Sequence, residues 1–362
     1  MGKSVLLFFI LTVTFSCVDE LTIKEVEAES FVIISGEVIN DGSKPVVAIA
    51  TVRNYSSQQV PETGALVTIS DDSGIVFKLH EESPGSYTVA TDELFEAVTG
   101  DRYTLHVQMA DGRRYESSPQ EMVENIAIES VSFTYKKEVL NFEDISKPHD
   151  AVGILVHPSS AIAHSFYLRW RWHGVYETRT FPEKRTKPDG PPPSVTPDPP
   201  ACSGYVVASG AAVKVGPCYC CNCWVEEYSN DVTVLSSAEY DNAPVNISNI
   251  AVDTRRFDIR YYIDVEQLAM NQEAFEFFSL ISKQQKAAQN IFQPNAIRIR
   301  GNVRSMSNPD ETVLGFFGTY AINRKSMFIY QSDLPETPPA PIDVNDDCRR
   351  LSNGRNVKPN FW

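Results

Sequence analysis

"DRYTLHVQMADG", residues 101 to 112, alternates apolar and polar side chains and then turns. One face of this stretch is apolar and consists of Tyr103, Leu105, Val107 and Met109, whereas the other is polar and consists of Thr104, His106 and Gln108. A period of two residues is typical of a strand with one buried face. Asp111-Gly112 then indicates a tight hairpin, because glycine tolerates positive φ. The stretch therefore predicts an antiparallel β-structure.

Similar short runs precede it between residues 30 and 122, separated by turn signals. They read FVIISGEVI (31–39), VVAIATV (46–52), GALVTIS (64–70), GIVFKL (74–79) and GSYTVA (85–90). This spacing is typical of a β-sandwich. We expect an immunoglobulin-like or carboxypeptidase-regulatory-like module over residues 30–122. It is either a ligand-binding module or a spacer, and the spacer is favoured because no polar groups converge in its loops.

A second, larger β-rich domain is predicted over residues 123–332. Its clearest strand is SFYLRWRWHG (165–174), in which Trp170 and Trp172 share one face with Phe166 and Leu168. The opposite face carries Tyr167, Arg169, Arg171 and His173. The tryptophans could form a sugar-stacking platform, but a stripe of this kind more often belongs to a core. We therefore expect a buried stripe with the arginines pointing outward.

One segment of this domain changes period and predicts an amphipathic helix over residues 272–288. Asn271 is a suitable N-cap, and Phe275, Phe278 and Ile281 recur at helical spacing. Strand-like stretches lie on both sides, RRFDIRYYIDV (255–265) before it and AIRIRGNV (296–303) after it. The expected fold class is thus mainly β, with a sandwich followed by a β-rich domain that carries one helix.

The segment 181–200 contains eight prolines in twenty residues. Proline lacks a backbone N–H and restricts φ, so this composition opposes both a ladder and a helix. We expect an exposed, extended loop that leads directly into a cysteine cluster over residues 202–223.

The first residues, MGKSVLLFFILTVTFSC, predict export and a lipid anchor. Lys3 precedes an apolar run of signal-peptide length, and the small Ser16 stands before Cys17, the pattern of a bacterial lipoprotein signal. We expect residues 1–16 to be removed, Cys17 to be acylated, and residues 17–29 to form a tether to the membrane. The alternative is an ordinary secretory signal with a chance cysteine. Val18-Asp19-Glu20 resembles the surface-export signal of Bacteroidota lipoproteins, which predicts an outer-membrane protein exposed at the cell surface.

Composition and motifs restrict the function classes. The formal net charge is −15 at pH 7, which disfavours nucleic acid as a partner. The chain lacks the Gly-x-Ser-x-Gly, His-Glu-x-x-His, phosphate-loop and dinucleotide-binding motifs. His157, His164 and His173 lie near one another in sequence but need not share a face. We therefore expect no enzyme, assign no catalytic residue and no cofactor, and interpret these histidines as scattered surface residues.

Six of the seven cysteines remain after Cys17 is assigned to lipid. They are Cys202, Cys218, Cys220, Cys221, Cys223 and Cys348. An even set in an exported protein favours disulfides, although adjacent Cys220 and Cys221 are poorly placed to pair with each other. We expect Cys348 to pair back to the cluster and to hold the tail, residues 333–362. Zinc or copper(I) binding and a redox Cys-x-x-Cys remain alternatives, and we predict no metal site.

The C-terminal third carries a resemblance to a known family. Its motifs are NIFQPNAIRIRGNVRS (290–305), with Gly301-Asn302-Val303, then DETVLGFFGTYAI (310–322), with Leu314-Gly315-Phe316-Phe317, and the terminal KPNFW (358–362). Together with the lipoprotein-like start and the cysteines before Trp224, they resemble the lipoproteins grouped as domain of unknown function 4249 (DUF4249). The resemblance covers nearly all of the chain after Cys17.

The resemblance implies an accessory lipoprotein of a TonB-dependent outer-membrane transporter. Such a protein would contact the transporter barrel as a lid or capture its substrate. It implies no catalytic residue. The alternatives are a stand-alone surface protein for binding, adhesion or assembly, and a hydrolase with an unfamiliar site.

Overall fold

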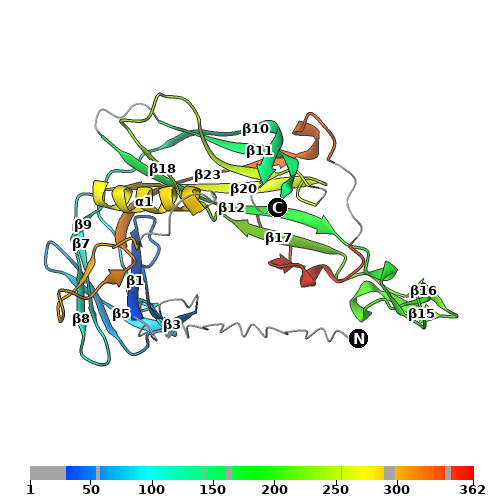
Figure 1. Cartoon of the computed structure of the whole chain (residues 1–362), viewed down its shortest axis with the longest axis horizontal. Coiled ribbons are helices and arrows are strands. Elements are labelled where there is room, and N and C mark those ends of the chain that lie inside the picture. Colours follow the sequence, from blue (N-terminus) through cyan, green and yellow to red (C-terminus); the bar gives the residue numbers. More distant parts are fainter. Residues whose placement is uncertain are drawn as a thin grey trace, which may run out of the picture.

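The computed structural model describes residues 30–53, 58–141, 144–159, 165–253, 255–288, 298–338 and 344–362. It is mainly β, with one α-helix among these residues (Figure 1). The predicted fold class is therefore confirmed. None of the described helices is long and apolar enough to cross a bilayer.

In the first unit, nine strands lie among the described residues. They are β1 (Ser30–Ile39), β2 (Val46–Arg53), β3 (Gln59–Pro61), β4 (Leu66–Asp71), β5 (Val76–Ser83), β6 (Ser86–Val89), β7 (Arg102–Gln108), β8 (Arg114–Ser117) and β9 (Gln120–Glu121). Hydrogen-bonded neighbours run in the order β1–β2–β6–β5–β4–β7–β8, with β3 also on β2 and β9 on β7. The apolar face predicted for 101–112 is buried, and Gly112 donates its N–H to the Met109 carbonyl at 2.9 Å, which closes the predicted turn.

Two facing sheets form the second unit. The larger one joins β24 (Gly354–Arg355), β17 (Asn222–Tyr228), β12 (Tyr167–Arg179), β20 (Arg260–Met270) and β23 (Phe317–Tyr330), with β18 (Thr233–Ser236) beside the first residues of β12. The smaller one joins β10 (Ile128–Asn141), β11 (Asp144–Pro158) and β19 (Val245–Ala251). Strand β20 begins at Arg260, within the predicted stretch 255–265, and continues to Met270.

The core of the second unit lies between these sheets. Val152, Ile154 and Val156 of β11 belong to the same buried cluster as Trp170, Ile263 and Val265 of the larger sheet. Trp170 is 1% exposed, and its Nε1–H donates to Gln267 Oε1 at 3.1 Å. The core interpretation of this tryptophan is confirmed, which removes it as a sugar platform.

Helix α1 (Gln272–Ala288) has the predicted bounds, and Asn271 caps it by accepting the N–H of Ala274 at 2.9 Å. It packs on β12 and β18 through Phe278 and its neighbours. The Arg169 guanidinium lies 4.1 Å from the centre of the Phe278 ring. The expectation that Arg169 points to solvent is thus wrong, because the helix covers this end of the strand and supplies a cation–π partner.

Strands from the C-terminal third return to the first unit. β22 (Val313–Leu314) and the first residues of β23 pair in parallel with β1, and β21 (Val303–Ser305) pairs with β8. In Figure 1 these orange segments lie beside the blue and cyan strands of the first unit. The two units therefore share strands that are far apart in the sequence.

The family-like motifs form this junction. A Cβ on Gly301 would lie 1.4 Å from the Gly315 carbonyl oxygen, so only glycine fits there. Gly315 itself has φ +91° and approaches the Ile34 carbonyl of β1. The buried Asn302 side chain donates to the Phe317 carbonyl at 2.8 Å and accepts the Phe317 N–H at 2.9 Å. These residues therefore hold the two units together at the junction.

The proline-rich segment is partly ordered into a ladder, which corrects the expectation of neither ladder nor helix. β13 (Thr186–Pro188) pairs with β14 (Val195–Pro197), and a short 3₁₀ turn, η1 (Pro182–Lys184), precedes them. Among the described strands these two pair only with each other, so their prolines occupy edge positions, where a missing N–H is tolerated. Further 3₁₀ turns are η2 (Ala201–Ser203), η3 (Gln331–Asp333) and η4 (Cys348–Arg350).

Candidate functional site

The six cysteines after Cys17 form three disulfides, which we call the clasp. The pairs are Cys202–Cys220, Cys218–Cys221 and Cys223–Cys348. The third joins residues 125 positions apart and ties the tail to β17, as expected for Cys348. Cys220, Cys223 and Cys348 are fully buried, whereas Cys202, Cys218 and Cys221 are partly exposed.

Backbone and ionic contacts support the clasp. The Cys348 N–H donates to the Cys220 carbonyl at 3.1 Å, and Thr180 at the end of β12 donates its N–H to the Cys221 carbonyl at 2.7 Å. Arg185, at the start of the proline-rich segment, bonds Asp198 and also reaches Asp346 in the tail at 3.2 Å. Its guanidinium holds the pKa of the Asp198 carboxyl below the ordinary value. Three segments distant in sequence thus meet at one end of the molecule.

The disulfide between Cys202 and Cys220 affects the alternative that these cysteines bind a metal. Ligand atoms of Cys202, Cys220 and Asp347 lie within 4.8 Å of one another. Both sulfurs belong to one disulfide, so neither offers the thiolate that zinc or copper(I) requires. The set could bind a soft metal only after reduction.

A two-stranded arm projects from the clasp. β15 (Tyr205–Ala208) and β16 (Ala211–Lys214) pair with each other and with no other strand that the structure describes. They lie at the end of the molecule opposite the first unit (Figure 1). Val206 and Val213 face each other across the ladder and are 46% and 45% exposed. Nearby Val215 and Tyr219 are 66% and 67% exposed. Apolar side chains gathered in this way on an exposed element are typical of a protein-interaction surface.

Charged residues on the larger sheet join it to the first unit. Arg171 of β12 contacts Glu37 of β1 at 3.0 Å and Glu266 of β20 at 2.5 Å. Arg324 of β23 contacts Glu266 at 2.9 Å and Asp41 at 2.7 Å. Burial raises the pKa of Glu266, but the charges and hydrogen bonds of the two arginines outweigh it, so this pKa lies below its ordinary value.

Further along the same sheet, aromatic side chains contact charged ones. The His173 ring stacks on Tyr228 at 4.7 Å, and the Tyr228 hydroxyl donates to Glu226 at 2.7 Å. Burial and the neighbouring Glu266 raise the pKa of Asp264, the cross-strand partner of His173.

The C-terminal residues also pack on this sheet. Phe361 stacks on Tyr262 at 4.1 Å, and Arg260 lies 4.6 Å from the Trp362 ring.

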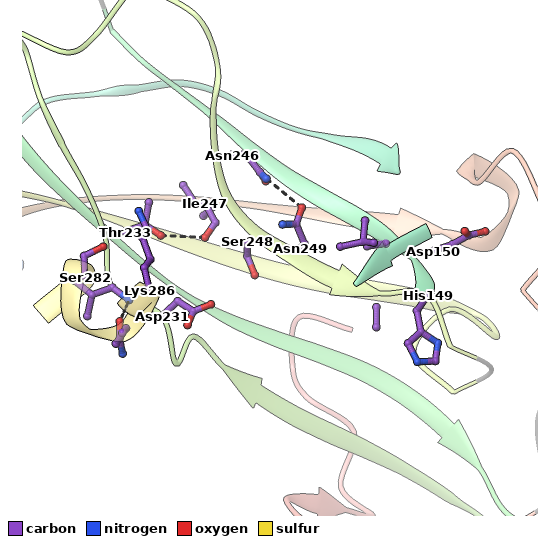
Figure 2. A pocket seen from close by; sticks show the side chains of 15 residues that line it. His149, Asp150, Asp231, Thr233, Asn246, Ile247, Ser248, Asn249, Ser282 and Lys286 are labelled. Carbon is purple, nitrogen blue, oxygen red and sulfur yellow. Dashed lines mark hydrogen bonds between the residues drawn. The ribbon is translucent and has the colours of Figure 1, made fainter. Parts of the chain in front are cut away.

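A polar hollow of about 380 Å³ lies between β11, β18, β19 and α1 (Figure 2). His149 and Asp150 stand at one end of it, and Asp231 and Lys286 at the other. Its polar groups bond mainly to one another, as when Thr233 Oγ1 donates to the Ile247 carbonyl at 3.3 Å. Among the residues that the structure describes, no hydrogen bond joins His149 to a serine or threonine hydroxyl.

The predicted site residues are thus distributed as follows. The clasp brings together six cysteines, while Cys17 and His164 lie outside the described residues. His157 contacts the Asn242 carbonyl at 3.1 Å, whereas His173 stacks on Tyr228, so the two histidines have different partners. Sequence reasoning missed the arm, whose repeated valines (Val206, Val207, Val213 and Val215) between glycines were the available signal.

Comparisons with known proteins identify the family and little else. Residues 18–326 match the family described as domain of unknown function (DUF4249). No curated protein matches the sequence. Among solved structures, a DUF4785 family protein from Legionella pneumophila aligns at 12% identity over 66% of this chain and 52% of its own, with a TM-score of 0.18. That score is too low to carry an argument. The family match spans most of the chain, and the protein therefore belongs to the DUF4249 family.

Proposed function

We propose that this protein is a non-enzymatic, lipid-anchored cell-surface protein that acts as an accessory subunit of a TonB-dependent outer-membrane transporter. The lipoprotein-like residues 1–17 and the three disulfides support an exported location, because disulfides persist in oxidising compartments. The anchor would keep the protein near its partner and so raise its effective concentration there.

The observation that carries the proposal is the projecting apolar arm. A lone two-stranded ribbon is marginally stable in water, so the chain holds this one in place with the clasp. Gly216 and Val215 both donate their N–H groups to the Gly204 carbonyl, at 3.0 and 2.8 Å, which closes the base of the arm. A group of exposed apolar side chains on a braced ribbon is typical of a protein-interaction site.

The test is native purification from outer membranes in mild detergent. We expect the wild-type protein to be recovered with a transporter barrel. The double variant Val206→Lys/Val213→Lys charges one face of the arm and should be recovered alone. Val76→Lys is the matched control, since Val76 is 60% exposed on β5 of the first unit. Recovery of the wild type without a barrel would contradict the proposal.

A stand-alone surface binding protein is the second candidate, and the polar hollow favours it. In that case the arm variant and the wild type would behave alike in the purification. A soluble ligand would then protect the hollow in the absence of any transporter.

A further inference from the structure

The two outer strands of the smaller sheet differ in how their free edges are protected. β10 carries Lys136 and Lys137, a positive φ of 54° at Glu138, and register shifts on either side of Val139. Lysines and bulges on an edge oppose pairing with another chain. β19 reads VNISNIA and contains no charged residue and no proline. Its one irregularity is the unpaired Ile247, so the run from Ser248 to Ala251 is regular.

The alternation of hydrogen-bonded and non-hydrogen-bonded pairs along the ladder shows which backbone groups of β19 point away from β11. The Val252 N–H donates to the Asp150 carbonyl at 2.7 Å, which makes these two residues a bonded pair. In an antiparallel ladder bonded and non-bonded pairs alternate. Ile250 and Ser248 therefore bond to β11, whereas the N–H and C=O groups of Asn249 and Ala251 point away from it. β19 pairs with no other described strand.

Two hollows open along this edge. The polar hollow of Figure 2 is lined by β19 residues on one side and by β18 and α1 on the other. A second hollow of about 550 Å³ adjoins it, lined by Trp172 and Tyr176 among others. The two share Asp231, Ser248, Asn249 and Ala251. Side chains of consecutive strand residues point to opposite faces, yet consecutive residues of β19 line each hollow. The two hollows are therefore bordered by the edge of β19 and not by one of its faces.

We propose that the free edge of β19 binds an extended peptide segment by strand addition, through the outward backbone groups of Asn249 and Ala251. The Ile247 carbonyl already accepts from Thr233, so four backbone groups on two residues remain for the peptide. A segment of about five residues, about 16 Å long, would cover this stretch. This site lies apart from the arm, and the inference does not rest on the proposed transporter role.

The lining indicates what kind of peptide fits. Acidic Asp150, Asp231, Glu226 and Glu227 are nearly balanced by Lys286, Arg255 and Arg256. Arg256 is moreover held by Glu227 at 2.5 Å. With little net charge in the groove, recognition depends on the peptide main chain, and side chains on alternate positions meet the polar hollow or the aromatic one. The partner is therefore an extended, proline-free polypeptide without a strong charge.

Hydrogen exchange tests the inference on the disulfide-bonded mature protein. The probe is a mixture of proline-free heptapeptides, and the matched probe is the same mixture N-methylated at every residue. Occupancy near 90% should slow exchange of the Asn249 and Ala251 amides about tenfold. The N-methylated mixture should have no effect, because it lacks N–H donors and its methyl groups keep its carbonyls from approaching the edge amides.

Two variants separate binding from folding. Asn249→Pro removes an outward N–H while leaving the ladder to β11 intact, a position where edge strands accept proline. In it, the heptapeptides should no longer slow exchange at Ala251. Asn249→Ala keeps the N–H and should retain the slowing, and Ala251→Pro repeats the test with Asn249 as the reporter.

Three outcomes would overturn the inference. The heptapeptides could fail to slow exchange at any concentration, or both probes could slow it equally. The third is slowing that grows with protein concentration alone, accompanied by a dimer in sedimentation, which would make a second copy of the chain the occupant of the edge.

Discussion

Single residues hold the two units together, and Asn302 is the clearest case. Its buried amide satisfies both the N–H and the C=O of Phe317 where β23 begins. Asn302→Ala leaves two buried backbone groups without partners and should lower the free energy of unfolding by about 2 to 4 kcal/mol. Denaturant unfolding measures this loss. Asn308→Ala, at an exposed turn on the same segment, is the control and should change little.

The loss at Asn302 should therefore exceed that at Asn308 several-fold. Equal effects of the two substitutions would mean that the amide does not support the junction.

Glu266 is the carboxylate on which Arg171 and Arg324 converge, and it should make stability depend on pH. Its pKa is lower in the folded chain than in the unfolded one, so the ionised form favours folding. This contribution is complete above the unfolded pKa and is lost as pH falls through the lowered folded pKa. Glu266→Gln should cost about 1 kcal/mol at pH 7, a modest value because the pair is partly exposed.

The difference in unfolding free energy between wild type and Glu266→Gln should shrink as pH falls below the ordinary glutamate pKa and through the lowered folded pKa. Glu82→Gln, an exposed position on β5, is the control and should follow the wild type throughout. If the difference in stability between wild type and Glu266→Gln grew at low pH, the predicted sign of the effect would be wrong.

At the scale of elements, the clasp disulfides should contribute unequally. Cys223–Cys348 closes a loop across 125 positions, whereas Cys218–Cys221 spans 3. On the chain-entropy model, replacing the long-range pair by serines should cost about 5 kcal/mol and replacing the short one about 2 kcal/mol. The double variants Cys223→Ser/Cys348→Ser and Cys218→Ser/Cys221→Ser, compared by guanidinium unfolding, measure the difference.

Loss of the long-range disulfide should also expose the tail to protease, because β24 contacts the body of the protein mainly through β17. Its other main contact, η4, carries Cys348 and belongs to the tail itself. The short-range variant should keep the tail protected. The reverse order would show that the tail is held by its aromatic contacts with the sheet and not by the disulfide.

At the scale of the whole molecule, the two units should fold as one. β1 pairs with β22 and β23, and β8 pairs with β21, so residues 30–122 in isolation would expose two unpaired edges. We expect that fragment to show no cooperative thermal transition by near-ultraviolet circular dichroism. The chain 30–362 is the control and should unfold in a single transition. A fragment that folds alone would show that the returning strands are dispensable.

The sequence by itself determined what depends on neighbouring residues. Period-two alternation placed the strand at 102–108, and a capping asparagine with helical spacing placed the helix at 272–288 with its bounds. It also identified the family and favoured disulfides for the six cysteines. These features follow from local hydrogen bonding and from the chemistry of an even cysteine set, which require no knowledge of distant segments.

Only the tertiary structure decided what depends on residues brought together from far apart. It selected one disulfide pairing among many, placed Arg169 against Phe278, and joined Gly301 and Gly315 beside β1. It also left β19 with a free edge, which periodicity along one strand cannot reveal. The closure of long loops around a shared core decides which strand edges stay open and which thiols meet. The free energy of this closure depends on the whole chain, so no single stretch of sequence reveals it.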